Sequence, residues 1–331
     1  MERFALAAAV VLGFALTATL CSLFVPLRRV LERREQNQQP VQPEQPRPAP
    51  LRAPLWGGLC AAAGTVAAVG VGWLAACVGQ PELLGSEGRL MTRLLTALAG
   101  SLAFGAVGLA EDLARMRSPA ALGLRRDVRL LLEALAAAFV LLLLQAAGCL
   151  PRGLDVPGAG YVLLGSAVPF LWAVLMVALA ECARIAERDE GTVCGAAFVA
   201  MLALMMAEAG LGVPGLAVLP AALAGALVAL LLWAFPPARL GVGCCGSLLA
   251  AGAIGCIPLS LDMTSLTVPL ALPFWAAGGL LAAQLLGAKR TGKPLRCWVK
   301  KHKMSPETVF LCSFALSAVG YVLALALLRW C

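Results

Sequence analysis

Residues 213–235 read VPGLAVLPAALAGALVALLLWAF, a run without one charged side chain. Its length matches the roughly 20 apolar residues that an α-helix needs to cross the hydrocarbon core of a bilayer. A transmembrane β-strand is about half as long, and in lipid a helix pairs all of its backbone polar groups within the segment. The run therefore predicts a membrane-spanning helix.

The rest of the chain has the same character. Its 331 residues are 61% hydrophobic and only 13% charged, with a mean hydropathy of +0.87. A soluble globular domain, with about 25% charged residues, is excluded. We predict one all-α polytopic membrane domain over residues 1–331, with about ten transmembrane helices. The expected spans are residues 4–26, 55–78, 91–110, 129–148, 159–180, 192–210, 213–235, 243–261, 268–287 and 306–329.

The basic residues follow an alternating pattern. Of 26 Lys and Arg residues, 21 lie after the first, third, fifth, seventh and ninth expected spans. The positive-inside rule places these five loops in the cytoplasm and both termini outside. Topology alone explains most of this charge, although anionic headgroups or a phosphorylated substrate could also meet it. We expect no nucleic-acid partner.

Two further features limit the possible functions. Residues 36–50 are rich in Gln and Pro, which predicts a flexible cytoplasmic linker. The twelve cysteines show no CxxC or Cys/His zinc spacing, so we expect neither a zinc site nor a disulfide framework. The few ionisable residues within the spans lie near helix ends, which argues against the charged relay of an ion-coupled transporter.

Carboxylates gather at two of the expected cytoplasmic loops. Glu111 and Asp112 are adjacent after the third span, and Glu187 and Glu190 follow the fifth. Carboxylate oxygens are the ligands that Mg²⁺ prefers in proteins. Taken one at a time, each of these residues is more often a solvated charge at the membrane surface.

Five short motifs, however, follow one another along the chain in an order that indicates a known protein family. They are APLWGG at 53–58, GLAED at 108–112, GL at 123–124 with Arg129 and Glu133, AFPPARLGVGCCGS at 234–247, and TGK at 291–293 followed by SPE at 305–307. These resemble the TPTMGG, G-hydrophobic-x-D-D, GLSxxxKxxxQ, NFxPAxxFMGDTGS and TGK…PE motifs of the MraY group of polyprenyl-phosphate phospho-sugar transferases. The fourth match is ungapped over its whole length and is the most specific.

The resemblance implies a function and a site. Members of the MraY group transfer a phospho-sugar from a uridine nucleotide to undecaprenyl phosphate, with Mg²⁺ at a cytoplasmic cleft of the bacterial inner membrane. Carried over by position, the catalytic candidates are Glu111, Asp112, Glu187 and Glu190, of which Asp112 and Glu190 are the candidate metal ligands. The candidate substrate-binding residues are Arg129, Arg184, Lys293 and His302.

The positions at which this sequence differs from the group lie mainly at its metal-binding and catalytic residues. Cys244 replaces the aspartate of GDTGS that serves as a magnesium ligand, and a neutral thiol is a poor ligand for a hard cation. Ala234 and Arg184 replace asparagines, and a single histidine, His302, stands where the group has consecutive histidines. Glutamates at 111, 187 and 190 keep the charge but move each carboxylate outward by about one methylene.

Two functional interpretations remain open from the sequence. The first is a divergent MraY-like protein with lost or weakened transfer, which binds a polyprenyl phosphate, a UDP-sugar or an envelope-assembly partner and could form a homodimer. The second is an active transferase with a rearranged magnesium site built from the four carboxylates. A transporter or a purely structural membrane protein is the minor alternative.

Overall fold

A computed structural model describes residues 2–38, 56–79, 88–117, 123–156, 160–163, 165, 167–187, 191–212, 215–236, 238–291 and 305–328. Each of the ten expected spans corresponds to one long helix there. These helices are α1 (Glu2–Gln38), α2 (Gly57–Gly79), α4 (Gly88–Arg117), α5 (Arg126–Ala146), α6 (Ala167–Ala186), α7 (Thr192–Gly210), α8 (Val218–Ala234), α9 (Gly243–Ser260), α11 (Leu272–Thr291) and α13 (Pro306–Leu328). Two short helices, η1 (Thr264–Leu266) and α10 (Thr267–Leu270), follow α9.

Within the described residues, 7 helices are long and apolar enough to cross a membrane. They are α1, α2, α4, α6, α7, α9 and α13, and α8 is a shorter apolar helix. The fold is thus that of a polytopic helical membrane protein. Helix α1 continues to Gln38, into the first residues of the 36–50 stretch for which the sequence predicts a linker, and the remainder of that stretch lies outside the described residues.

One element departs from the all-α expectation. The expected span 159–180 is wrong at its start, because β1 (Gly153–Val156) and β2 (Gly160–Leu163) form an antiparallel hairpin before α6 begins at Ala167. Gly160 and Gly165 have positive φ angles of 72° and 56°, which are open to glycine and interrupt a helix. All of β2 is exposed.

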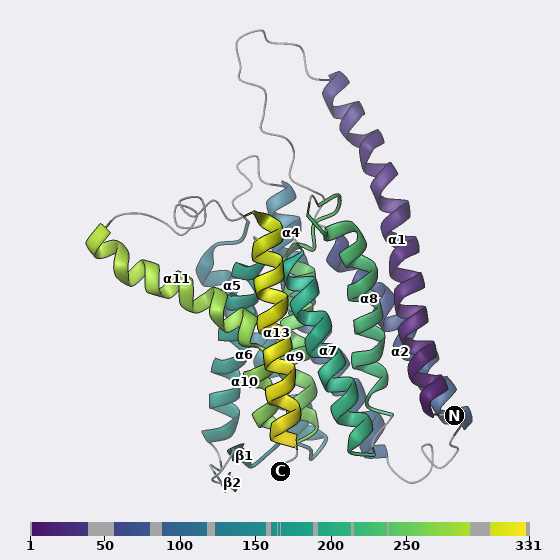
Figure 1. Ribbon diagram of the computed structural model, residues 1–331, viewed down its shortest axis with the longest axis vertical. Coiled ribbons are helices and arrows are strands. Elements are labelled where there is room, and N and C mark those ends of the chain that lie inside the picture. The colour runs from purple at the N-terminus through teal and green to yellow at the C-terminus, as the bar shows by residue number, and fades with distance from the viewer. Residues whose placement is uncertain are drawn as a thin grey trace.

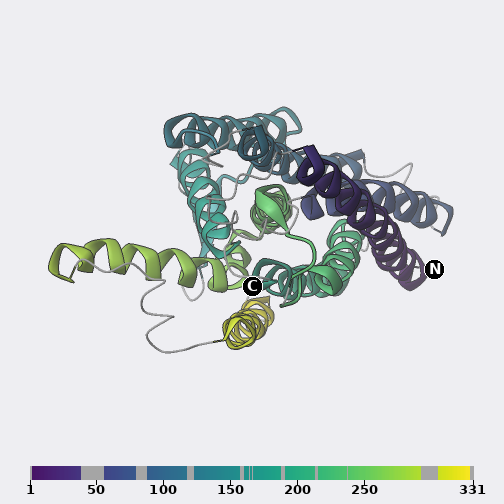
Figure 2. The same ribbon diagram turned by 90° about the horizontal axis from the view of Figure 1, so that it is seen from above.

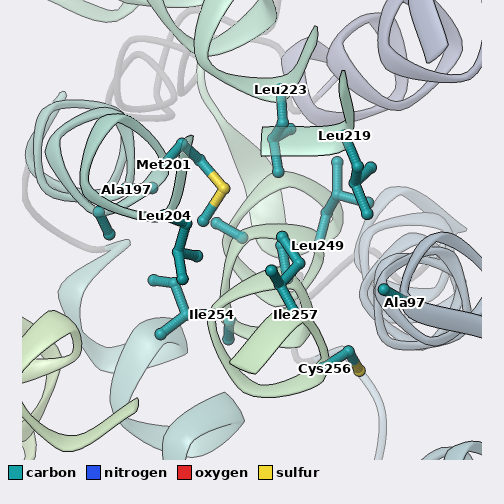
Figure 3. Packing of buried hydrophobic residues seen from close by; sticks show 14 of the residues in the cluster. Ala97, Ala197, Met201, Leu204, Leu219, Leu223, Leu249, Ile254, Cys256 and Ile257 are labelled. Atoms are coloured by element: carbon teal, nitrogen blue, oxygen red, sulfur yellow. The ribbon is translucent and has the colours of Figure 1, made fainter. Parts of the chain in front are cut away.

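Helix α9 forms the centre of the bundle, and every one of its residues is buried. Figure 2 shows it ringed by the other helices, and α2, α4, α6 and α7 all contact it. Figure 3 shows Met201 of α7 and Leu223 of α8 directed toward Leu249 of α9. Glycine and alanine fill much of α9, which lets neighbouring backbones approach closely, as at helix interfaces in membranes.

The two ends of the bundle differ. Helix α1 begins and α13 ends at the same end, whereas α4 ends and α13 begins at the other (Figure 1). Helix α11 leans away from the bundle toward that second end. The second end carries the residues that the motifs single out.

Candidate site at the α4, α6 and α9 helix ends

Asp112 caps the beginning of α9. Its Oδ1 accepts a hydrogen bond from the Cys244 backbone N–H at 3.1 Å, and its Oδ2 accepts one from the Cys245 N–H at 2.9 Å. The first N–H groups of a helix have no partner within the helix, and the helix dipole favours a negative charge there. Both oxygens of this buried carboxylate therefore hold α9 in place.

Three of the sequence motifs meet at this helix end. The N–H of Gly57 donates to Gly241 O at 3.2 Å, and the N–H of Gly58 donates to Val242 O at 2.8 Å. A Cβ atom on Gly58 would collide with the backbone of Gly246, and one on Gly108 would collide with the backbone of Cys244. The motifs APLWGG, GLAED and AFPPARLGVGCCGS therefore meet in close backbone contact, which leaves no room for a side chain at Gly58 or Gly108.

An arginine lies among the predicted acidic residues. Arg115 Nη2 is 2.7 Å from Glu111 Oε1, and Arg115 Nη1 is 3.9 Å from Asp112 Oδ1 and 3.8 Å from Glu187 Oε2. The structure thus brings together Glu111, Asp112 and Glu187 around one guanidinium. The sequence interpretation missed Arg115, which was counted only as a loop charge, although its i,i+4 spacing from Glu111 is the signal for a pair on one helix face.

A second ion-pair group joins α5 to α6. Arg129 Nε donates to Glu181 Oε1 at 2.8 Å, and Arg184 Nη2 donates to Glu181 Oε2 at 2.6 Å. Arg129 Nη1 also lies 3.6 Å from Glu111 Oε1, so the two groups share Glu111. Glu133 is fully buried 3.9 Å from Arg129 Nε. Two predicted substrate contacts, Arg129 and Arg184, are therefore engaged by carboxylates.

Cys244 lies at the place of the missing metal ligand. Its Sγ is 3.8 Å from Glu187 Oε2, and both residues are largely buried. Burial raises the pKa of the Glu187 carboxyl above its usual value, while the Arg115 guanidinium lowers it. With a thiol in place of a carboxylate at Cys244, the group around Arg115 contains three carboxyls, from Glu111, Asp112 and Glu187, and not four.

These side chains do not fit a magnesium ion. Asp112 uses both oxygens for α9, Glu111 is paired with two arginines, and Cys244 offers sulfur where Mg²⁺ demands oxygen. Among the described residues, no three His, Cys, Asp or Glu side chains are placed to hold one metal ion together. The predicted site residues Glu190, Lys293 and His302 lie outside the described residues.

Comparison with known proteins places the chain among its relatives. Residues 94–262 match Glycosyl transferase family 4, a segment that runs from within α4 past the end of α9. The phospho-N-acetylmuramoyl-pentapeptide-transferase of Mycobacterium tuberculosis (strain H37Rv) is 28% identical over 265 residues, which is 72% of each chain. The protein of the same name from Geobacillus kaustophilus is 25% identical over 296 residues, covering 88% of this chain and 86% of that protein.

A third relative of that name, from Synechococcus sp. (strain RCC307), is 30% identical over 212 residues, covering 63% of this chain and 55% of that protein. The matched segment includes Asp112, Glu187 and Cys244, so the family assignment covers the site itself. The resemblance to the MraY group is confirmed. This membrane protein belongs to glycosyl transferase family 4 and is an MraY-like member of it.

Proposed function

We propose that the chain is a divergent MraY-like protein in which phospho-sugar transfer is lost or greatly weakened. In this proposal it binds polyprenyl phosphate or a UDP-sugar and acts in envelope synthesis at the bacterial inner membrane. Ten helices cross that membrane, with five loops in the cytoplasm and both termini outside. The common end of α1 and α13 supports this topology (Figure 1).

One observation carries the loss of transfer: Cys244 places sulfur, 3.8 Å from Glu187 Oε2, at the position where the MraY group has a carboxylate ligand for magnesium. Arg115 contacts Glu111, Asp112 and Glu187 at distances of 2.7 to 3.9 Å. A metal-dependent transferase needs a divalent cation to stabilise charge on its phosphate groups. Three carboxylates and one guanidinium do not supply the net positive charge that this task requires.

Ligand binding rests on the family membership and on the membrane helices. The resemblance to the MraY group implies a polyprenyl phosphate and a UDP-linked sugar as the ligand classes, and the matched relatives are named phospho-N-acetylmuramoyl-pentapeptide-transferase. We assign Arg129, Arg184, Lys293 and His302 to ligand binding by position. For Arg129 and Arg184 this role requires a phosphate to compete with Glu181.

The test is release of UMP from UDP-MurNAc-pentapeptide or UDP-GlcNAc, with polyprenyl phosphate in detergent. We expect no magnesium-dependent release above background from the wild-type protein. We also expect Cys244→Asp to gain less than about tenfold, or about 1.4 kcal/mol, because catalytic groups that act as a unit are not restored one at a time. A well-folded preparation is verified by size-exclusion chromatography.

The alternative is an active transferase with a rearranged magnesium site. The observation that favours it is the retention of acids at 111, 112 and 187, whose side chains all lie within 3.9 Å of the Arg115 guanidinium. Such an enzyme would first have to displace Arg115. Robust magnesium-dependent turnover by the wild type, abolished by Asp112→Asn, would establish this alternative and refute the proposed function.

A further inference from the structure

Glu181 of α6 uses its two carboxylate oxygens on two different arginines. Its Oε1 accepts a hydrogen bond from Arg129 Nε of α5 at 2.8 Å, and its Oε2 accepts one from Arg184 Nη2, one turn further along α6, at 2.6 Å. Guanidiniums bind a phosphate group in the same way, through charge-assisted bonds to separate oxygens. The Glu181 carboxylate therefore occupies the place that a phosphate group would take between these arginines.

Glu181 is the most accessible of the three side chains. It is 23% exposed, whereas the side chains of Arg129 and Arg184 are 9% and 13% exposed. A carboxylate released from the arginines at this position has solvent beside it, and hydration offsets part of the cost of breaking its bonds. An anion that arrives from the solvent can therefore exchange with the Glu181 carboxylate.

The two arginines differ in their other contacts. Arg129 Nη1 lies 3.6 Å from Glu111 Oε1, and Arg129 Nε lies 3.9 Å from Glu133 Oε1. Within the part of the chain that the structure describes, Glu181 is the only ion-pair partner of Arg184, and Arg184 Nε is buried without a hydrogen-bond partner. When Glu181 leaves, Arg129 is still held by two acids, whereas Arg184 becomes an unpaired charge.

We infer that Arg129 and Arg184 form an anion site that Glu181 keeps closed, and that a phosphate group opens it by displacing the Glu181 carboxylate. The inference rests on the ligand-binding role that the proposed function gives to the two arginines, and it adds an internal competitor. Arg184 stands where the MraY group has an asparagine, so its charge is a feature of this chain and not of that group. A lipid phosphate and a free phosphate present the same oxygens and are both candidate ligands.

The experiment measures anion binding and not turnover. The purified full chain in detergent, in a buffer free of phosphate, is titrated calorimetrically with inorganic phosphate and, separately, with undecaprenyl phosphate in micelles. The variants are Glu181→Gln, which removes the competing charge, and Glu181→Gln/Arg184→Gln, which also removes the freed cation. Asp127→Asn is the matched control, because it removes one negative charge from an exposed position in the first turn of α5.

We expect wild type and Asp127→Asn to bind phosphate equally weakly, and Glu181→Gln to bind at least one of the two probes about tenfold more tightly, a difference of about 1.4 kcal/mol. The double variant should lose this gain. The inference is overturned if folded Glu181→Gln gains affinity for neither probe, or if Asp127→Asn gains as much. Where Glu181→Gln does not fold, Arg184→Gln decides: it should weaken the residual binding of phosphate by the wild type, and an unchanged affinity overturns the inference.

The two probes separate the sources of the phosphate. A gain for both assigns the site to the phosphate group alone, and a gain for undecaprenyl phosphate only assigns it to the lipid. The outcomes also separate the inference from the proposed function. Magnesium-dependent UMP release by the wild type would refute the proposed loss of transfer and leave a gain of phosphate binding by Glu181→Gln standing. Tight binding of undecaprenyl phosphate by the wild type, unchanged in Glu181→Gln, would refute the inference alone.

Discussion

Replacing Asp112 with alanine removes the acceptor of two amides at the beginning of α9, which bond to it at 3.1 and 2.9 Å. The residue is buried, so water cannot replace the carboxylate fully. A hydrogen bond to a charged group contributes about 1.5 to 3 kcal/mol. Because the loss of a desolvated charge offsets part of this, we take the lower figure for each bond and expect a total loss of about 3 kcal/mol.

Equilibrium unfolding in mixed micelles measures this loss. The control is Asp127→Ala, which removes an exposed aspartate from the first turn of α5 and should cost only about 0.5 kcal/mol through the helix dipole. Asp112→Asn keeps one acceptor oxygen and should fall between wild type and Asp112→Ala. If Asp112→Ala unfolds like Asp127→Ala, the capping role is wrong and Asp112 is free to act as a metal ligand.

Four further predictions concern the same site and the membrane topology. Cys244→Asp should lower the free energy of unfolding by up to about 4 kcal/mol relative to Cys244→Ser, because it places a second carboxylate near 3.8 Å from Glu187; denaturant titration compares the two. Burial raises the pKa of Glu187 in the folded protein, so ionisation of this carboxyl opposes folding. In unfolding experiments, the free energy of unfolding of the wild type should fall relative to that of Glu187→Gln as the pH rises above about 4.3. At lower pH the two values should converge. Polyprenyl phosphate at 100 times its dissociation constant should add about 2.7 kcal/mol in thermal unfolding, and Lys293→Ala should reduce this gain. Labelling of Cys297 from the cytoplasm and of Cys331 from outside checks the orientation, and labelling of Cys297 from outside alone would contradict it.

Hydropathy predicted the existence of the long helices but not all of their boundaries. The span expected at 91–110 ends where the charged residues Glu111 and Asp112 begin, yet α4 continues to Arg117. The charged side chains of its last turns find partners at Glu187, just after α6, and at the beginning of α9, and such long-range contacts cannot be read from a local window. The hairpin was missed for a related reason: residues 160–163 are apolar and extend the next hydrophobic run.

The sequence predicted the acidic residues of the candidate site but not the arginine that neutralises part of their charge. The resemblance to the MraY group assigns Glu111, Asp112, Glu187 and Cys244 to one cleft, and the structure brings these four side chains together. The family pattern assigns a role to each acid by its position and says nothing of what neutralises it. The i,i+4 spacing of Arg115 from Glu111 indicates a pair on one helix face, but the contact of Arg115 with Glu187 is known only from the structure.

Charge balance also bears on where a phosphate can bind. The two ion-pair groups contain the carboxyls of Glu111, Asp112, Glu133, Glu181 and Glu187 and the guanidiniums of Arg115, Arg129 and Arg184. Acids outnumber bases, and each of these arginines contacts a carboxylate, so this group offers an anionic ligand no unpaired positive charge. Residues 289–303 hold seven Lys and Arg residues and no acid. Under the proposed function, we expect the attraction for a lipid or nucleotide phosphate to come mainly from this basic stretch, with Lys293 a stronger candidate for the phosphate contact than Arg129. Arg129 joins α4, α5 and α6 through its contacts with Glu111 and Glu181.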